Sequence, residues 1–129
     1  MQLNINGKEY DLNFGIGFLR ELDKKYYIER NGAKFGNSME MKIPMLLAKD
    51  TVTLADVLYT ATHALKKRPS QTDIDAFIDS AEDIEALFDE VIEELKKSNA
   101  TKSQVAKLLT FLQLTTKEEK VEAKTETME

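Results

Sequence analysis

The chain has 129 residues, of which 42% are apolar, and a formal net charge of −5. This length suffices for one domain with its own core, and the absence of cysteine excludes disulfides, iron–sulfur clusters and thiolate zinc sites. No stretch approaches the roughly 20 apolar residues that span a bilayer, and no basic segment with a following apolar run opens the chain. We therefore expect a soluble cytoplasmic protein without membrane contact.

The charge is distributed unevenly along the chain. Residues 70–95 hold ten acidic and no basic residues, whereas residues 1–69 hold 11 basic and 8 acidic residues. An acidic middle argues against sequence-independent binding to phosphate backbones, so we expect no nucleic-acid partner. A local contact through Lys66-Lys67-Arg68 stays open.

The N-terminal segment 1–14 has the pattern of a β-hairpin. Apolar residues alternate with polar ones on both sides of Asn6-Gly7, a dipeptide that suits a two-residue turn because both positions tolerate a positive φ. Such a turn pairs Ile5 with Lys8 and Leu3 with Tyr10, which gathers the apolar side chains on one face. A lone hairpin is marginally stable in water, so this face must lie on helices.

From Ile16 onward the apolar period changes from two to 3.6, which predicts a helix to about Ile28 that ends near Asn31-Gly32. The following stretch to Lys42 shows no period and is expected to be a loop. A short apolar segment follows from Ile43, with Pro44 suited to a first helical turn.

Thr53-Leu54-Ala55-Asp56 resembles a capping box and predicts a helix to about Lys67, which Arg68-Pro69-Ser70 ends. A further apolar stripe covers residues 72–97 and fits one long helix or two. Ser80-Ala81-Glu82-Asp83 resembles a fresh cap, so we favour a break there.

A last helix is expected over residues 101–114, followed by a flexible charged tail over 115–129 with too little apolar surface to order it. The predicted fold is mainly α, with the N-terminal β-hairpin packed on a small bundle of about five helices (16–114) and a disordered C-terminal tail. Residues 1–114 form the domain.

Candidate chemistry is sparse. The segment Gly15-Ile16-Gly17 lacks the third glycine of a dinucleotide fingerprint, because Arg20 holds that position, so we interpret it as a closely packed corner. His63 is the sole histidine and is expected at the surface or at its boundary. We predict no catalytic residues, no metal, no cofactor and no enzyme activity.

Two features suggest partner surfaces instead. Glu85, Asp89 and Glu93 stand four apart on one helix face, which fits a solvated face, a partner surface of opposite charge or, least well, a metal site. The final stripe is wider than a core face needs, so it either closes the core or binds a partner in part. Its residues are Val105, Leu108, Leu109, Phe111, Leu112 and Leu114.

The chain resembles the tail assembly chaperones of long-tailed phages and prophages of Gram-positive bacteria over roughly residues 1–103. The resemblance lies in the hairpin, in FGIGFLRELDKKY, in the following Gly/Asn loop, in IPMLLAKDTVTLADVLYTAT and in EDIEALFDEVIEELKKSNATK. It implies a helical protein that binds the tape measure protein, helps to recruit tail tube subunits and is absent from the mature virion. It also implies a homo-oligomer, with a spiral as its proposed form.

Two hypotheses follow for the partner-binding residues. The acid face of Glu85, Asp89 and Glu93 meets Lys66, Lys67 and Arg68 of a neighbouring copy. Leu108, Phe111 and Leu112 contribute to tape measure binding. The rival classes are another phage morphogenesis part, such as a head–tail connector, and a generic helical adaptor.

Overall fold

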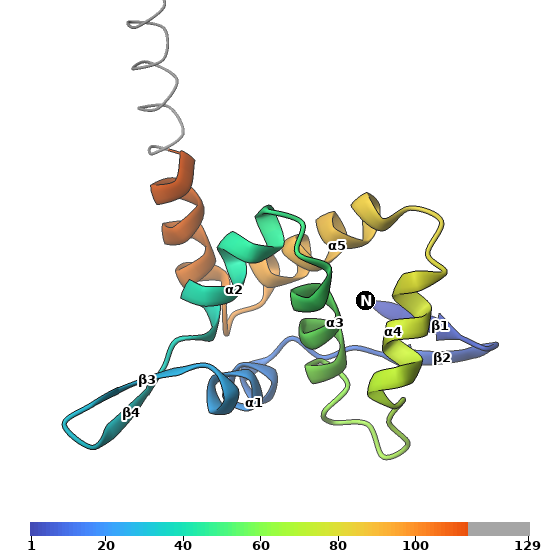
Figure 1. The fold of residues 1–129 in the computed structure, drawn as a ribbon, viewed down its shortest axis with the longest axis horizontal. Coiled ribbons are helices and arrows are strands. Elements are labelled where there is room, and N and C mark those ends of the chain that lie inside the picture. Colours follow the sequence, from blue (N-terminus) through green and yellow to red (C-terminus); the bar gives the residue numbers. More distant parts are fainter. Residues whose placement is uncertain (114–129) are drawn as a thin grey trace, which may run out of the picture.

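The computed structural model of the protein describes residues 1–113. It opens with the predicted hairpin, in which β1 (Gln2–Ile5) pairs antiparallel with β2 (Lys8–Asp11). Asn6 and Gly7 both have positive φ, and the predicted pairs Leu3–Tyr10 and Ile5–Lys8 are confirmed. Leu3 and Ile5 are buried, and β1 contacts α4 (Gln71–Asp79), as Figure 1 shows. The alternation therefore does place one face of the hairpin on the helices.

The first helix is shorter than predicted, and a second hairpin replaces its last turn and part of the predicted loop. α1 covers Ile16–Lys25, and Tyr26 has already left the helical conformation. β3 (Tyr27–Arg30) and β4 (Ala33–Gly36) then pair around Asn31-Gly32, again with positive φ at both turn residues. Every residue of these two strands is exposed, so the sequence carries no alternation of buried residues that would reveal them.

The second helix begins earlier than predicted. α2 covers Ser38–Leu47, so Pro44 lies inside it and not in its first turn. The N-cap residue Asn37 makes no side-chain cap bond; instead Asp23 of α1 accepts hydrogen bonds from the Ser38 amide (3.1 Å) and the Ser38 hydroxyl. A cap from another helix leaves no local sequence signal.

The third helix is displaced from its predicted range at both ends. α3 covers Thr51–Thr60, and its N-cap is Asp50, whose carboxylate accepts from the Thr53 amide at 3.1 Å. Thr53 is therefore inside the first turn. After Thr60 the chain continues as turns, because Arg68 folds back onto α3, as described below.

The remaining helices follow the prediction. α4 begins with a capping box between Ser70 and Asp73, and the favoured break is confirmed because α4 ends at Asp79 and α5 (Ile84–Lys97) has its own N-cap, Asp83. Residues 102–113 are helical as well. The predicted C-terminal tail and Leu114 lie outside the described residues.

The helices and the first hairpin contribute to one core, with α3 contacting α1, α2 and α4 (Figure 1). Its largest fully buried side chains are Phe18, Leu22, Met39, Ile43, Leu46, Leu54, Leu58, Ile74, Phe88 and Leu95. The close packing predicted at Gly15-Ile16-Gly17 is confirmed for Gly17, because a Cβ atom on this residue would lie 2.7 Å from Cε1 of His63. His63 is half-buried, at the boundary of the core.

Candidate partner-binding surfaces

Lysine side chains of the same chain form ion pairs with all three residues of the predicted acid face. Lys49, between α2 and α3, lies 3.2 Å from a Glu85 carboxylate oxygen and 3.3 Å from an Asp89 oxygen. Desolvation lowers the pKa of Lys49, but its hydrogen bonds to Glu85 and Asp89 outweigh that effect and raise it. Glu93 pairs with Lys96 at 3.0 Å. These exposed pairs contribute little stability, but they reduce the charge that the face offers to a partner.

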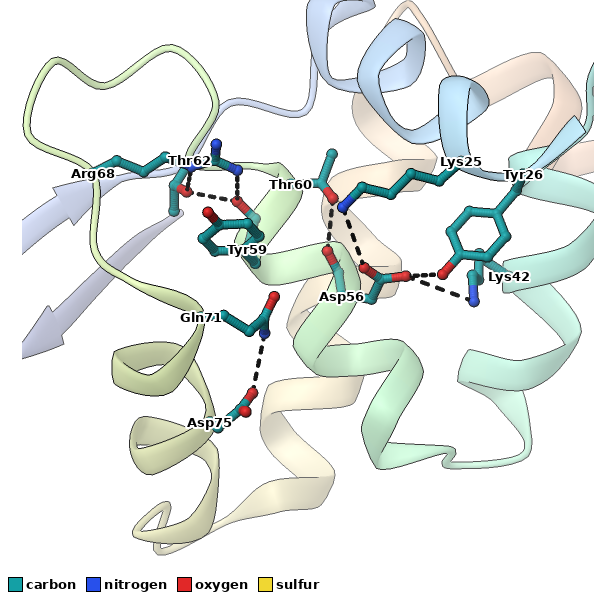
Figure 2. A network of polar contacts seen from close by, with 10 residues as sticks. All are labelled: Lys25, Tyr26, Lys42, Asp56, Tyr59, Thr60, Thr62, Arg68, Gln71 and Asp75. Atoms are coloured by element: carbon teal, nitrogen blue, oxygen red, sulfur yellow. Dashed lines mark hydrogen bonds and ion pairs between the residues drawn. The ribbon is translucent and has the colours of Figure 1, made fainter.

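The three residues of the predicted basic cluster, Lys66, Lys67 and Arg68, differ in their surroundings. The Arg68 guanidinium stacks 3.9 Å from the centre of the Tyr59 ring, and it donates to the Tyr59 carbonyl (3.0 Å) and the Thr62 hydroxyl (2.8 Å), as Figure 2 shows. Arg68 therefore fixes the turn after α3. Lys66 and Lys67 are exposed.

The apolar residues of the final helix also differ in their burial. Val105 is buried, and Leu108 and Leu109 are half-buried against the core. Leu112 is half-buried and Phe111 is exposed. The inner part of the predicted stripe thus closes the core, and its outer part lies at the surface.

A further apolar face lies on α2, whose first residues, up to Lys42, fall in the predicted loop. Met41, Pro44, Met45 and Ala48 follow the helical spacing i, i+3, i+4, i+7 on the side opposite the buried Met39, Ile43 and Leu46. Met41 is 41% and Met45 40% exposed. We call these four residues the α2 apolar face. Its spacing is visible in the sequence only once the helix is known to begin at Ser38.

A network of polar contacts centres on Asp56 of α3 (Figure 2). Its carboxylate accepts a hydrogen bond from the Tyr26 hydroxyl and lies 3.8 Å from both Lys25 and Lys42. Lys42 is buried and its ammonium lies 3.8 Å from the centre of the Tyr26 ring. Since a buried cation needs a counter-charge, Asp56 stabilises Lys42 as well as Tyr26.

Tyr26 remains a hydrogen-bond donor over a wide pH range. Burial, and next the hydrogen bond to Asp56, raise the pKa of Tyr26 to about 12. The network ties the end of α1 to α3. Because Tyr26 immediately precedes β3, this tie also fixes the base of the second hairpin.

A groove of about 540 Å³ lies between α3 and α4. Val52, Ala55 and Ile78 form its apolar part, and Asp75 and Asp79 supply carboxylates on the α4 side. Val52 is 78% exposed. We call it the α3–α4 groove.

Within residues 1–113, no group of three or more histidine, aspartate or glutamate side chains has the arrangement of a metal site. In the same part of the chain, no helix is long and apolar enough to cross a bilayer.

Comparison with known proteins gives a match to a protein family. The model of a family described as phage tail assembly chaperone protein, TAC, matches residues 2–110. Neither the curated proteins nor the solved structures compared with the chain gave a significant match.

Proposed function

The chain belongs to the phage tail assembly chaperone family, and from this premise we propose that it binds the tape measure protein and keeps it soluble in the host cytoplasm. In the same proposal it helps to recruit tail tube subunits and leaves before the virion is complete. The tape measure contact is the part that the surface of this chain supports most directly.

The observation that carries the proposal is the α2 apolar face. Three exposed apolar residues (Met41, Met45, Ala48) and the half-buried Pro44 follow the helical spacing on one side of α2, in a chain of which 32% of the residues are charged. Contiguous exposed apolar surface marks interaction sites, and methionine side chains adapt to irregular partners because they are unbranched and flexible. Such a face suits the apolar stripe of a partner helix.

The outer part of the final helix supports a second contact with the same partner. Phe111 is exposed, with Leu112 half-buried one position further along. Leu108 packs against the core, so its role in the contact is a minor one and its replacement would also disturb the fold. We propose Phe111 and Leu112, with Leu108 behind them, as this contact.

Co-expression with the tape measure protein tests the proposal. The double variant Met41→Asp, Met45→Asp places two charges on the α2 apolar face, at side chains that are about 40% exposed, and we expect most of the tape measure protein to become insoluble. Ala86→Asp is the matched control, because it also adds a carboxylate at an exposed apolar position, on α5. If the double variant folds and still solubilises the tape measure protein like the control, the α2 apolar face is not the contact.

Phe111→Asp tests the second contact separately. We expect less tape measure protein to co-purify with this variant while its circular dichroism and melting temperature stay close to those of the parent chain. Unchanged co-purification would remove Phe111 from the proposed contact.

The contact between copies through Glu85, Asp89 and Glu93 stays a proposal of its own. Since Arg68 is engaged with Tyr59, Lys66 and Lys67 are the cations that remain for it. A contact of this kind between exposed charges is screened by salt. Light scattering over a salt series tests it: association that does not change with ionic strength contradicts this contact.

A further inference from the structure

The second hairpin, β3–β4, is held firmly at its base. The Asn37 amide donates to the Tyr26 carbonyl at 2.9 Å, the Tyr26 hydroxyl donates to Asp56, and Asp23 accepts from Ser38. Gly36 packs so closely on Asp23 that a Cβ atom would overlap the carboxylate. Both strands are nevertheless exposed along their whole length. The fold therefore presents a hairpin in a fixed direction.

The two faces of this hairpin differ. Tyr27, Lys34 and Gly36 line a groove against α1, with the Lys34 ammonium 4.8 Å from the centre of the Tyr27 ring. Ile28 and Phe35 are directly opposite each other in the register and so share the other face. Phe35 is 56% exposed and Ile28 is exposed as well.

The next pair on that outer face is Arg30 with Ala33, beside the turn. The outer face thus offers an aromatic ring, an aliphatic side chain and one guanidinium. An isolated two-stranded hairpin is marginally stable in water, and contiguous exposed apolar side chains mark interaction sites. The composition of the outer face is that of an interface core with a charged edge.

The α3–α4 groove has the complementary composition. Its apolar part (Val52, Ala55, Ile78) matches Ile28 and Phe35, and the carboxylates of Asp75 and Asp79 match Arg30. Arginine pairs well with carboxylates because its planar guanidinium donates several hydrogen bonds in a fixed geometry.

Within one chain the hairpin extends away from the groove, although Tyr26, the residue before β3, belongs to the groove lining. Figure 1 shows β3–β4 projecting from one end of the long axis, with α3 between it and α4 near the other end. Two different surfaces that match each other between copies form a head-to-tail contact, which repeats into a ring or an open helical array.

We propose that the outer face of the β3–β4 hairpin (Ile28, Arg30, Phe35) docks into the α3–α4 groove of a second copy of this chain. Phe35 fills the apolar part of the groove, and Arg30 binds Asp75 and Asp79. This contact differs from the charged one between α5 and Lys66-Lys67, and it does not depend on the tape measure contact of α2.

Sedimentation velocity of the full chain over a concentration series tests the contact. We expect Phe35→Asp and Arg30→Glu each to weaken self-association about tenfold or more, and Asp79→Arg to do the same. The double variant Arg30→Glu, Asp79→Arg restores the pair with reversed signs and should regain much of the association. Lys8→Glu, a charge reversal beside the turn of the other hairpin, is the control and should associate like the parent chain.

Cross-linking gives a second measurement, because the chain has no cysteine of its own. A mixture of Phe35→Cys and Val52→Cys proteins should form a disulfide-linked pair on oxidation, whereas each variant alone should remain largely unlinked. This pattern is specific to a head-to-tail contact, because a symmetric one would bring residue 35 near its own copy.

Three outcomes would overturn the proposal. The first is self-association of folded Phe35→Asp and Arg30→Glu that equals that of the parent chain, or a parent chain that stays monomeric throughout. The second is failure of the mixed cysteine variants to link above the level of each alone. The third is a Phe35→Asp protein that associates normally but no longer retains the tape measure protein, which would assign the hairpin to that partner.

Discussion

Single residues decide where elements of this fold approach each other most closely. Gly17 and His63 are separated by 46 positions in the chain but are in direct contact, since any side chain at position 17 would meet the imidazole ring. Nε2 of His63 is buried, and within the described residues it makes no hydrogen bond. The position of the ring is thus set at least at this side by its close contact with Gly17 and not by a hydrogen bond of Nε2.

Replacing Gly17 with alanine should therefore destabilise the protein. The added methyl group must displace the His63 ring, and overpacking of this kind costs about 1–3 kcal/mol, which exceeds the gain of up to about 1 kcal/mol from alanine in a helix. In a His63→Ala background the clash disappears, so Gly17→Ala should become neutral or stabilising. Urea denaturation of the four proteins measures both effects, and an equal effect of Gly17→Ala in the two backgrounds would contradict this explanation.

Tyr26 gives the protein a pH dependence in the alkaline range. Its pKa in the folded protein is raised to about 12 from the ordinary value of 10.0. The folded state thus holds the phenolic proton more tightly than the unfolded state. This contribution to stability is complete below about pH 10 and is lost as the pH rises toward 12.

Denaturation at pH 9 and above, compared with a Tyr26→Phe variant, measures this contribution. The phenylalanine variant should lose less stability than the parent chain over the range from about pH 10 to 12. Ultraviolet titration of tyrosinate should also show one of the four tyrosines ionising late in the parent chain only. Parallel curves for the two proteins would mean that Tyr26 is not the group responsible.

At the scale of elements, the sequence predicts those whose signals are local. The first hairpin combines Asn6-Gly7 with alternation on both sides, and α4 begins at a capping box formed by its own residues, Ser70 and Asp73. These signals lie within a few residues of the element they define. Physical rules of turn and cap chemistry therefore suffice to find both elements.

Elements that depend on distant residues were predicted wrongly. α2 begins at Ser38 because Asp23 caps it from another helix, and α3 ends at Thr60 where Arg68 folds back onto Tyr59. The β3–β4 hairpin has the same Asn-Gly turn as the first, but its strands are wholly exposed and thus lack alternation. The α2 apolar face was not predicted because it depends on the start of α2 at Ser38, and the α3–α4 groove was not predicted because it depends on how two helices pack.

The cap on α2 can be tested directly. Asp23→Ala removes the acceptor of the Ser38 amide and hydroxyl, which should cost about 1–2 kcal/mol of stability, and Asp23→Asn should cost less because one acceptor oxygen remains. Hydrogen exchange should also speed up in β3–β4, whose base Asp23 supports. Glu21→Ala, on the same helix, should change neither quantity appreciably, and an Asp23→Ala protein that behaves like it would contradict the role of this cap.

At the scale of the whole molecule, the proposed contacts lie on different elements. The α2 apolar face is assigned to the tape measure protein, and the outer face of β3–β4 is assigned to a second copy of the chain. Copies that are joined head to tail would bind a long partner at many points, so weak single contacts would add up through effective concentration. A coat of this kind needs no single tight site.

This arrangement predicts that a substitution in the β3–β4 hairpin weakens binding to a long tape measure protein but not to a short fragment of it. For a tape measure fragment that accommodates one copy, Phe35→Asp should bind as tightly as the parent chain, because the α2 apolar face is unchanged. For the full-length tape measure protein the same variant should bind at least about tenfold more weakly, since each copy then binds without its neighbours. Binding measured by fluorescence anisotropy for the fragment and by co-purification at several concentrations for the full-length protein separates the two cases.

The variant Met41→Asp, Met45→Asp should lose both kinds of binding and keep its self-association. Equal losses of binding to the short fragment for this variant and for Phe35→Asp would show that the two surfaces are not independent.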